Sequence, residues 1–311
     1  MKAKLAALSE IIKKTAQGWN DDDPFRSSAV IAYYAIFSLP ALLVLIINVA
    51  GVFFGTDTVS GEISKQVESV MGEETAKQVA DIVANAGTIK AGIISSIIAI
   101  ATIIFGATGV FVQLQKALNE IWDVKQKSTK GFLRMLKNRL FSFGLILSIG
   151  FLLLISLVIS SVLAATSEWM KNILPDAIVY VFFVLEFGIS LVVTGTLFAL
   201  MFKFLPDVKM RWKDIIPGAF LTGLLFMLGK YALSLYFGKA DPASAYGVAG
   251  SVVLILLWTS YSSMIVFFGA EFTKQRAVYY GKKMTPTKNA EMTKIDFDAA
   301  DSENFTAEKS G

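Results

Sequence analysis

YVFFVLEFGISLVV, residues 180–193, is apolar except for Glu186 and Ser190. A charge at the centre of a membrane helix costs roughly 2.5–3.5 kcal/mol on insertion scales, so this carboxylate needs a physical reason. The stretch belongs to one of six blocks that each approach or exceed the roughly 20 apolar residues needed to span a bilayer. The blocks are about 28–54, 93–112, 140–165, 178–203, 215–237 and 248–273. We therefore predict an all-α polytopic membrane bundle with six transmembrane helices.

The composition agrees with a membrane protein and excludes several kinds of catalysis. Hydrophobic residues make up 54% of the chain and charged residues 17%, below the roughly 25% of ordinary soluble domains. The chain has no cysteine and no histidine, which excludes disulfides, Cys or His metal sites and histidine-based catalytic triads. We interpret Asp21, Asp22 and Asp23, directly before Pro24, as helix-capping acids rather than metal ligands. We expect no metal, no cofactor and no enzymatic activity.

The number of lysine and arginine residues is alternately high and low in successive loops. Of the 29 basic residues, 23 fall on one side of the predicted membrane and 5 on the other, and Lys230 lies within a span. The positive-inside rule then places both termini in the cytoplasm. The predicted organisation is an amphipathic cytoplasmic segment at 1–24, a six-span membrane domain at 25–280 and a disordered acidic tail at 281–311.

The N-terminal stretch MKAKLAALSEIIKKTAQGWN (1–20) lacks the continuous apolar core of a signal peptide. Its apolar residues recur at roughly helical spacing, with lysines on the other side: Leu5, Leu8, Ile11, Ile12 and Trp19. This pattern predicts a helix that lies on the membrane surface or packs on the protein's own cytoplasmic loops. Both alternatives stay open at this point.

Two loops have sequence patterns that indicate structure or binding rather than a simple connection. The outer loop, 55–92, repeats its apolar residues at three and four and predicts two short amphipathic helices with a break at Gly72. The inner loop, 113–139, ends in a basic run: Lys125, Lys127, Lys130, Arg134, Lys137 and Arg139. Such a run beside a span attracts anionic lipid head groups, although topology marking alone would also explain it. Membrane lipids are therefore expected partners.

The tryptophans and small residues indicate how the spans are bounded and packed. Four tryptophans fall at predicted span ends, where aromatic belts form: Trp19, Trp122, Trp169 and Trp212. Trp258 lies deep in a span and is expected to pack between helices. Small residues that permit close helix approach include Ala219 and Gly223.

Glu186 and Lys230 are ionisable residues well inside spans, at similar predicted depth on successive antiparallel helices. This placement predicts an ion pair. Ser190 and Thr194 follow Glu186 at i+4 and i+8 on one helix face. The polar line is either part of a substrate path in the outer half of the bundle or a pair that fixes helix register.

Two further positions within the spans are candidates for function. Pro40 is expected to kink or break the first span, and a broken helix carrying Tyr33, Tyr34 and Ser38 would suit a substrate site, with a plain kink as the alternative. Glu271 lies near the cytoplasmic end of the last span, where it meets Lys274 or a basic loop, or else extends to the membrane interface.

Four motifs stand out along the chain: SSAVIAYYAIFSLPALLVL (27–45), QLQKALNEIWDV (113–124), FKFLPDVKMRWKDIIPGAFLTGLLF (202–226) and YGVAGSVVLILLWTSYSSMIVFFGAEFTK (246–274). Together they resemble the YihY / virulence factor BrkB family of bacterial inner-membrane proteins, over about residues 20–280. Asp207 departs from the pattern, since the family has Asn more often after the Leu-Pro. The resemblance implies a multi-pass protein of the bacterial plasma (inner) membrane. It brings no agreed substrate or catalytic residue.

The leading functional hypothesis is a transporter or exporter of an unidentified, lipid-like or amphipathic substrate. The alternative is a non-transporting membrane scaffold of an envelope complex, and a homo-oligomer or envelope-complex partners stay open. The family is often labelled ribonuclease BN, but this chain has no histidine to ligate a hydrolase metal and no basic soluble domain for RNA. A membrane-associated ribonuclease is therefore a distant third hypothesis, and we expect no nucleic-acid partner.

Overall fold

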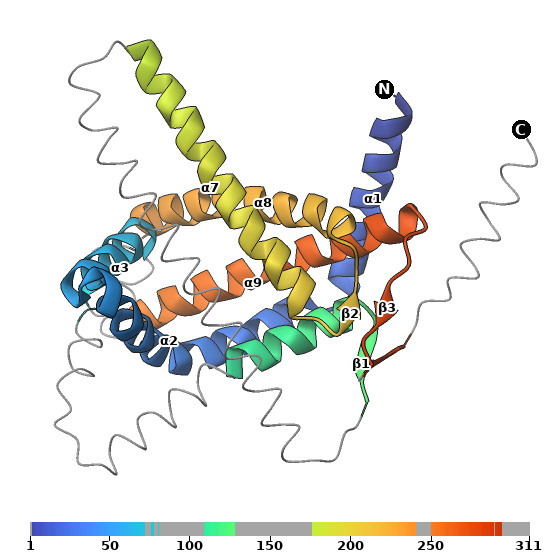
Figure 1. Cartoon of the computed structure of the whole chain (residues 1–311), viewed down its shortest axis with the longest axis horizontal. Helices are drawn as coiled ribbons and strands as arrows, with labels where there is room; N and C mark the ends of the chain where they lie inside the picture. Colours follow the sequence, from blue (N-terminus) through green and yellow to red (C-terminus); the bar gives the residue numbers. More distant parts are fainter. Residues whose placement is uncertain are drawn as a thin grey trace, which may run out of the picture.

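The structure, a computed structural model, describes residues 2–71, 76–77, 80, 109–127, 176–240, 250–288 and 290–293. Its helices are α1 (Lys2–Asp21), α2 (Pro24–Phe54), α3 (Thr56–Met71), α7 (Asp176–Phe204), α8 (Trp212–Ala240) and α9 (Gly250–Tyr279), and residues 109–121 are also helical. Its strands are β1 (Val124–Gln126), β2 (Val208–Lys209), β3 (Thr285–Pro286) and β4 (Ala290–Met292). Figure 1 shows long helices forming the body and short strands gathered at one end.

Three helices in the described chain are long and apolar enough to cross a membrane. Their apolar stretches are Phe187–Phe204 in α7, Trp212–Phe237 in α8 and Val252–Tyr279 in α9. They coincide with the predicted spans at 178–203, 215–237 and 248–273, and α2 covers the predicted span at 28–54. The span at 140–165 and most of the span at 93–112 lie outside the described residues. A helical membrane bundle is thus confirmed, while six spans and the sidedness of the termini stay predictions.

Helix α9 is the central element of the described bundle, because it packs against α1, α2 and α8. Helix α7 packs on α8, and α3 contacts α2, α8 and α9. α1 and the strands lie at one end of α9, and α3 lies at the other (Figure 1). The segments predicted to face opposite sides of the membrane therefore lie at opposite ends of the molecule.

Helices α8 and α9 meet through four residues that we call the threonine–glycine lock: Gly218, Thr222, Gly269 and Thr273. A Cβ on Gly218 would lie 1.9 Å from the Thr273 hydroxyl oxygen, and one on Gly269 would lie 1.7 Å from that of Thr222. Each threonine donates its hydroxyl to the glycine carbonyl one turn earlier in its own helix, at 2.7 and 2.8 Å. The hydroxyls are thereby satisfied inside fully buried positions, and the two backbones approach closely.

The contact between α7 and α8 uses the small residues that the sequence indicated. A Cβ on Gly223 would lie 3.2 Å from the backbone nitrogen of Gly195 on α7, and Ala219 is fully buried. Trp258 packs edge-on against Phe226 of α8, with ring centroids 5.7 Å apart. The close approach predicted at Gly223 and the helix contact predicted for Trp258 are confirmed.

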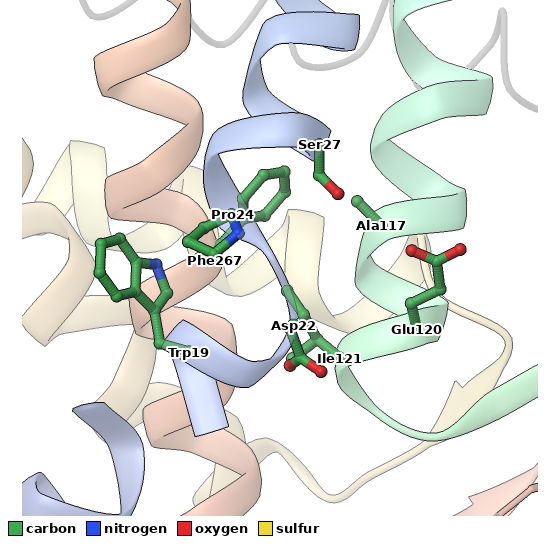
Figure 2. A pocket seen from close by; sticks show the side chains of 8 residues that line it. All are labelled: Trp19, Asp22, Pro24, Ser27, Ala117, Glu120, Ile121 and Phe267. Carbon is green, nitrogen blue, oxygen red and sulfur yellow. The ribbon is translucent and has the colours of Figure 1, made fainter. Parts of the chain in front are cut away.

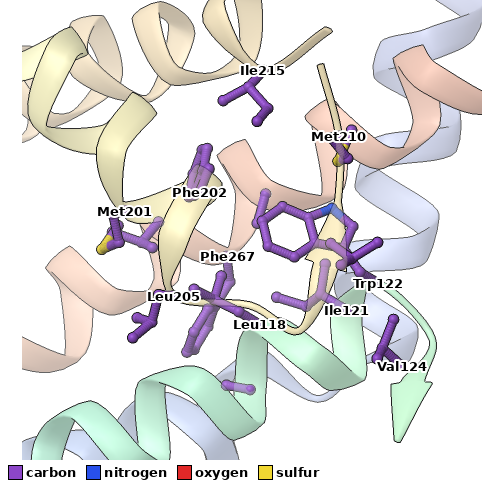
Figure 3. Close-up of a cluster of buried hydrophobic side chains, with 14 of the residues drawn as sticks. Leu118, Ile121, Trp122, Val124, Met201, Phe202, Leu205, Met210, Ile215 and Phe267 are labelled. Atoms are coloured by element: carbon purple, nitrogen blue, oxygen red, sulfur yellow. The ribbon is translucent and has the colours of Figure 1, made fainter. Parts of the chain in front are cut away.

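An apolar core lies where the helix at 109–121 meets α7, α8 and α9 (Figure 3). Leu118 and Trp122 are fully buried there, and the Trp122 ring contacts Phe202 edge-on at 5.8 Å. The prediction of Trp122 in an interfacial aromatic belt is therefore wrong, because residues 117–122 at the start of the inner loop pack into the core of the bundle. Trp169 lies outside the described residues.

Four short strands tie the end of the chain to two earlier segments. β4 pairs antiparallel with β1, with Lys125 opposite Glu291, and β3 pairs antiparallel with β2. Met284 and Ala290 are each 3% exposed. The structure thus differs from the disordered tail predicted for 281–311, because residues 285–286 and 290–292 satisfy backbone groups in these pairings. Residues 294–311 lie outside the described part.

Asp207, between α7 and β2, holds these segments together. Its Oδ2 accepts hydrogen bonds from the side-chain amides of Gln115, Asn119 and Gln126, at 3.3, 2.9 and 2.7 Å. Its backbone N–H donates to Asn119 Oδ1 at 2.8 Å, and its carbonyl accepts from the N–H of Thr287 at 2.9 Å. An acceptor-only carboxylate matches three amide donors.

We expect Gly218→Ala to destabilise the protein by about 1–3 kcal/mol, because its Cβ would overlap Thr273 in a packed interface. Gly188→Ala in α7 is the matched control, because a Cβ there meets nothing within 4 Å. That change should leave stability equal or raise it by up to about 1 kcal/mol, since alanine favours helix. Thermal unfolding in detergent measures the stability of both variants. Equal melting temperatures would show that close packing at the threonine–glycine lock does not stabilise the protein.

Candidate functional site

The site begins at the junction of α1 and α2. Asp23 adopts a left-handed backbone conformation (φ 48°) and caps α2, its Oδ1 accepting from the N–H of Arg26 at 3.3 Å, with Pro24 at the first helical position. The capping role predicted from the sequence is thus confirmed for Asp23. Asp21 and Asp23 are exposed, whereas Asp22 between them is half-buried.

Asp22 belongs to a carboxylate–lysine cluster formed by Asp22, Asp123, Glu271 and Lys274. Lys274 Nζ lies 2.7 Å from Asp123 Oδ2 and 3.8 Å from Glu271 Oε2. Glu271 is fully buried and accepts a hydrogen bond from Gln275 Nε2 at 2.6 Å. Of the two predicted alternatives for Glu271, pairing with Lys274 is confirmed. Within the described ranges, no group of three acidic side chains is arranged to hold a metal.

Helix α1 is seated directly on this cluster. A Cβ on Gly18 would lie 2.1 Å from Glu271 Oε1, and the Trp19 indole N–H donates to the carbonyl of Met264 at 3.1 Å. Ile11 is also buried. The predicted alternative of packing on the protein is confirmed for this face, although α1 packs on α9 rather than on loops. Another face presents exposed apolar side chains, Leu5, Leu8 and Ile12.

The protonation of Asp22 is sensitive to this environment. Burial raises the pKa of Asp22 from 3.8 to about 6; Lys274 opposes this rise, and the nearby carboxylates of Asp123, Asp21 and Glu120 add to it. Asp22 Oδ2 is inaccessible to solvent and has no hydrogen-bond partner in the described chain. A buried acceptor without a donor marks a place where a proton or a donor group would be stabilised.

Two adjoining hollows open beside Asp22, between α2 and the helix at 109–121. The inner pocket has a volume of about 10 Å³ and is lined by Trp19, Asp22, Pro24, Ser27, Ala117, Glu120, Ile121 and Phe267 (Figure 2). The groove has a volume of about 210 Å³ and is lined by Arg26, Ser27, Val30, Gln113, Lys116, Ala117 and Glu120. Ser27, Ala117 and Glu120 line both, so the groove leads towards Asp22.

An exposed apolar strip continues from the groove along α2. Val30, Tyr33 and Phe37 are 39%, 59% and 61% exposed, at helical spacing from Arg26. The rings of Tyr33 and Phe37 contact each other at 5.2 Å. Tyr34 is half-buried, and a Cβ on Gly109 would lie 2.7 Å from its ring. The hollow is thus polar and charged at one end and apolar along its continuation.

The structure treats the candidates on α2 differently. Tyr33 and Tyr34 lie about one helical turn beyond Val30, which lines the groove, whereas the side chains of Ser38 and Pro40 lie outside the described part. α2 continues through Pro40 as one helix, so the predicted break is wrong. A proline removes one backbone hydrogen bond, and a helix of 31 residues packed on α9 keeps the others.

The Glu186–Lys230 pair stays a prediction. The helices that carry these residues, α7 and α8, do pack together, but the side chain of Glu186 lies outside the described part. Lys230 is half-buried on α8. Ser190 and Thr194 are half-buried on α7, and neither lies at the groove.

The basic run of the inner loop is described only at its start. Lys125 and Lys127 are exposed, and Lys125 lies opposite Glu291 across the β1–β4 pair. Lys130, Arg134, Lys137 and Arg139 lie outside the described residues. The sequence analysis missed Arg26, Gln113, Lys116 and Glu120 as site residues. Their positions next to predicted spans were the available signal.

Long apolar helices with charged groups gathered at one end define a helical membrane protein. The chain matches the virulence factor BrkB family over residues 15–292 and belongs to that family. The match ends at the last residue of β4, which places the C-terminal strands within the matched region.

Individual relatives are named as membrane proteins. The chain is 24% identical to a UPF0761 membrane protein of Pseudoalteromonas atlantica over 82% of this chain and 81% of the relative. It is 26% identical to one of Verminephrobacter eiseniae over 67% of this chain and 47% of the relative, so it spans about half the length of that protein. It also matches 39% of the length of one from Delftia acidovorans, at 26% identity over 55% of this chain. No solved structure matches.

Asp22 is expected to make stability depend on pH. Because its pKa is raised in the folded state, the folded chain binds more protons than the unfolded chain between pH 3.8 and about 6. The contribution of Asp22 to stability therefore falls as the pH rises through this window and is constant above it. Asp22→Asn should remove that part of the slope in unfolding measurements from about pH 4 to about pH 8. An unchanged slope would contradict the burial argument.

Lys274 is expected to be essential for the cluster. Lys274→Met leaves Asp123 and Glu271 mostly buried without their cation, and removing one partner of a buried pair costs about 3–5 kcal/mol. Lys274→Met combined with Asp123→Asn should recover part of the loss, because one orphaned charge is removed. Unfolding in detergent measures both. A single variant as stable as the parent would show that the cluster contributes nothing.

Proposed function

We propose that the protein is a membrane transporter or exporter of an amphipathic, lipid-like substrate, and that the groove beside α2 admits this substrate. The observation that carries the proposal is the continuity of the groove with the exposed strip of Val30, Tyr33 and Phe37. An amphipathic molecule places a polar head and an apolar chain next to each other, and this surface offers a matching charged hollow and apolar strip in the same order.

The location of the groove supports the same proposal. It opens at the start of α2, at the end of the bundle where the strands and α1 gather (Figure 1). By the distribution of basic residues, this end is the predicted cytoplasmic face of a bacterial inner-membrane protein. A lipid taken from the inner leaflet would then meet the groove with its head at the interface and its chain along α2.

The absence of histidine and cysteine from the chain favours a role in moving or holding a molecule over one in reacting with it. If the transport uses ATP, another chain supplies the ATP site, because the sequence contains no phosphate-binding loop of the G-x-x-x-x-G-K-[ST] type.

The test is transbilayer lipid movement in liposomes that contain the purified protein. Phospholipids labelled on an acyl chain should become accessible from outside to a membrane-impermeant quencher. Tyr33→Lys should slow this movement about tenfold, a change of about 1.4 kcal/mol, because a charge interrupts the apolar strip.

Tyr231→Lys on α8 is the matched control, since Tyr231 is 68% exposed and does not line the groove. It should change the rate by less than about threefold. If both variants slow lipid movement equally, the apolar strip on α2 is not part of the substrate path. No movement of lipids or solutes by well-folded protein would overturn transport and favour the scaffold.

A further inference from the structure

The charges of the groove and inner pocket are separated by sign. Arg26 and Lys116 line the groove, whereas Asp22 lines the inner pocket and Glu120 stands between the two hollows. A cargo that carries only negative charge would meet Glu120 and Asp22, and one that carries only positive charge would meet Arg26 and Lys116. A head group that carries both charges a short distance apart satisfies all four side chains.

The cationic end suits a phosphate. Arg26 Nε lies 3.3 Å from Asp23 Oδ2, but the two side chains are 70% and 57% exposed, and such surface pairs contribute little stability. Arg26 can therefore exchange this partner for a ligand. Lys116 is also exposed, and Gln113 and Ser27 add hydrogen-bond donors to the same wall. Arginine and lysine together are common phosphate-binding side chains.

The acidic end suits a primary ammonium. The inner pocket, at about 10 Å³, has room for one water-sized group. An ammonium is of that size and brings three donors and no acceptor, which matches a pocket lined by two carboxylates, those of Asp22 and Glu120. Figure 2 shows Trp19 and Glu120 on opposite sides of the pocket, with Asp22 below and between them.

The remaining acids and bases around Asp22 do not compete for this position. Lys274, the nearby cation of the cluster, is held by Asp123 at 2.7 Å and by Glu271 at 3.8 Å. The raised pKa of Asp22 fits a carboxylate that still lacks a counter-charge after Lys274 is taken into account.

We propose that the groove and inner pocket recognise the head group of a phospholipid with a primary amine, of the phosphoethanolamine type. Arg26 and Lys116 bind the phosphate, and Glu120 and Asp22 bind the ammonium. The strip of Val30, Tyr33 and Phe37 takes the first part of the acyl chain, which favours a lipid over a free phosphoethanolamine ester. This inference deepens the proposed function and rests on it for the choice of a lipid cargo.

The head-group preference is tested by native mass spectrometry of the full-length, delipidated protein in detergent. Matched lipids with an ethanolamine, choline or glycerol head group are added separately. We expect the ethanolamine lipid to bind about tenfold more tightly than the other two, since the inner pocket is too small for a trimethylammonium, and a glycerol brings no positive charge to its carboxylates. Equal binding of the three lipids would overturn the proposal.

Variants assign the two ends of the site. Glu120→Gln should reduce the preference for the ethanolamine lipid over the glycerol lipid to less than about threefold. The double variant Arg26→Gln with Lys116→Gln should weaken the binding of both lipids about tenfold. Glu10→Gln and Lys209→Gln, exposed and away from the groove, are the charge-matched controls and should change neither. A Glu120→Gln protein that keeps the full preference would remove Glu120 from the site.

Two further results separate the sources of failure. If glycerophosphoethanolamine, which has no acyl chain, displaces the lipid at equal concentration, the lipid assignment is overturned. Binding is measured without transport, so lipid movement in liposomes with no head-group preference would overturn this inference and leave the proposed function standing. A clear preference in a protein that moves no lipid would overturn the proposed function alone.

Discussion

The described bundle depends on how closely α8 and α9 approach at the threonine–glycine lock. In a membrane, helices gain little from burying apolar surface, because lipid chains are equally apolar, so close packing and satisfied polar groups must hold them together. Thr222 and Thr273 meet both needs, since each hydroxyl is bonded within its own helix while the side chain fills the space left by a glycine. This contact fixes α9, against which α1 and α2 are then packed.

The position of α9 determines the charged end of the molecule. Glu271 precedes Thr273 of the lock by two residues, and Gly18 lets α1 lie directly against the Glu271 carboxylate. The chain leaves α1 beside this cluster and enters α2 through the capped turn at Asp23. Asp22 is thereby buried next to the groove. The same helix contact that stabilises the bundle thus places the acidic side chains at its polar end.

Long apolar helices and charged residues at their ends could be predicted from the sequence, whereas contacts between distant segments could not. Apolar length indicated α7, α8 and α9, and a charged residue at the end of the last span indicated Glu271 with Lys274. The sequence gives no indication that β4 pairs with β1, because Ala290–Met292 lies in a segment with few large apolar residues and its partner is far away in the chain. The groove was missed for the same reason: Arg26 and Glu120 become neighbours only when α2 packs beside the helix at 109–121.

The strand pairings at the end of the chain have a consequence for biosynthesis. One wall of the groove, the helix at 109–121, runs into β1, and β1 is completed by β4 from residues 290–292. Asp207 is bonded to Thr287 in the same region. These contacts cannot form until the chain has been synthesised through residue 292. The described membrane helices are therefore synthesised before the polar end is assembled, and the groove takes its final shape only after them.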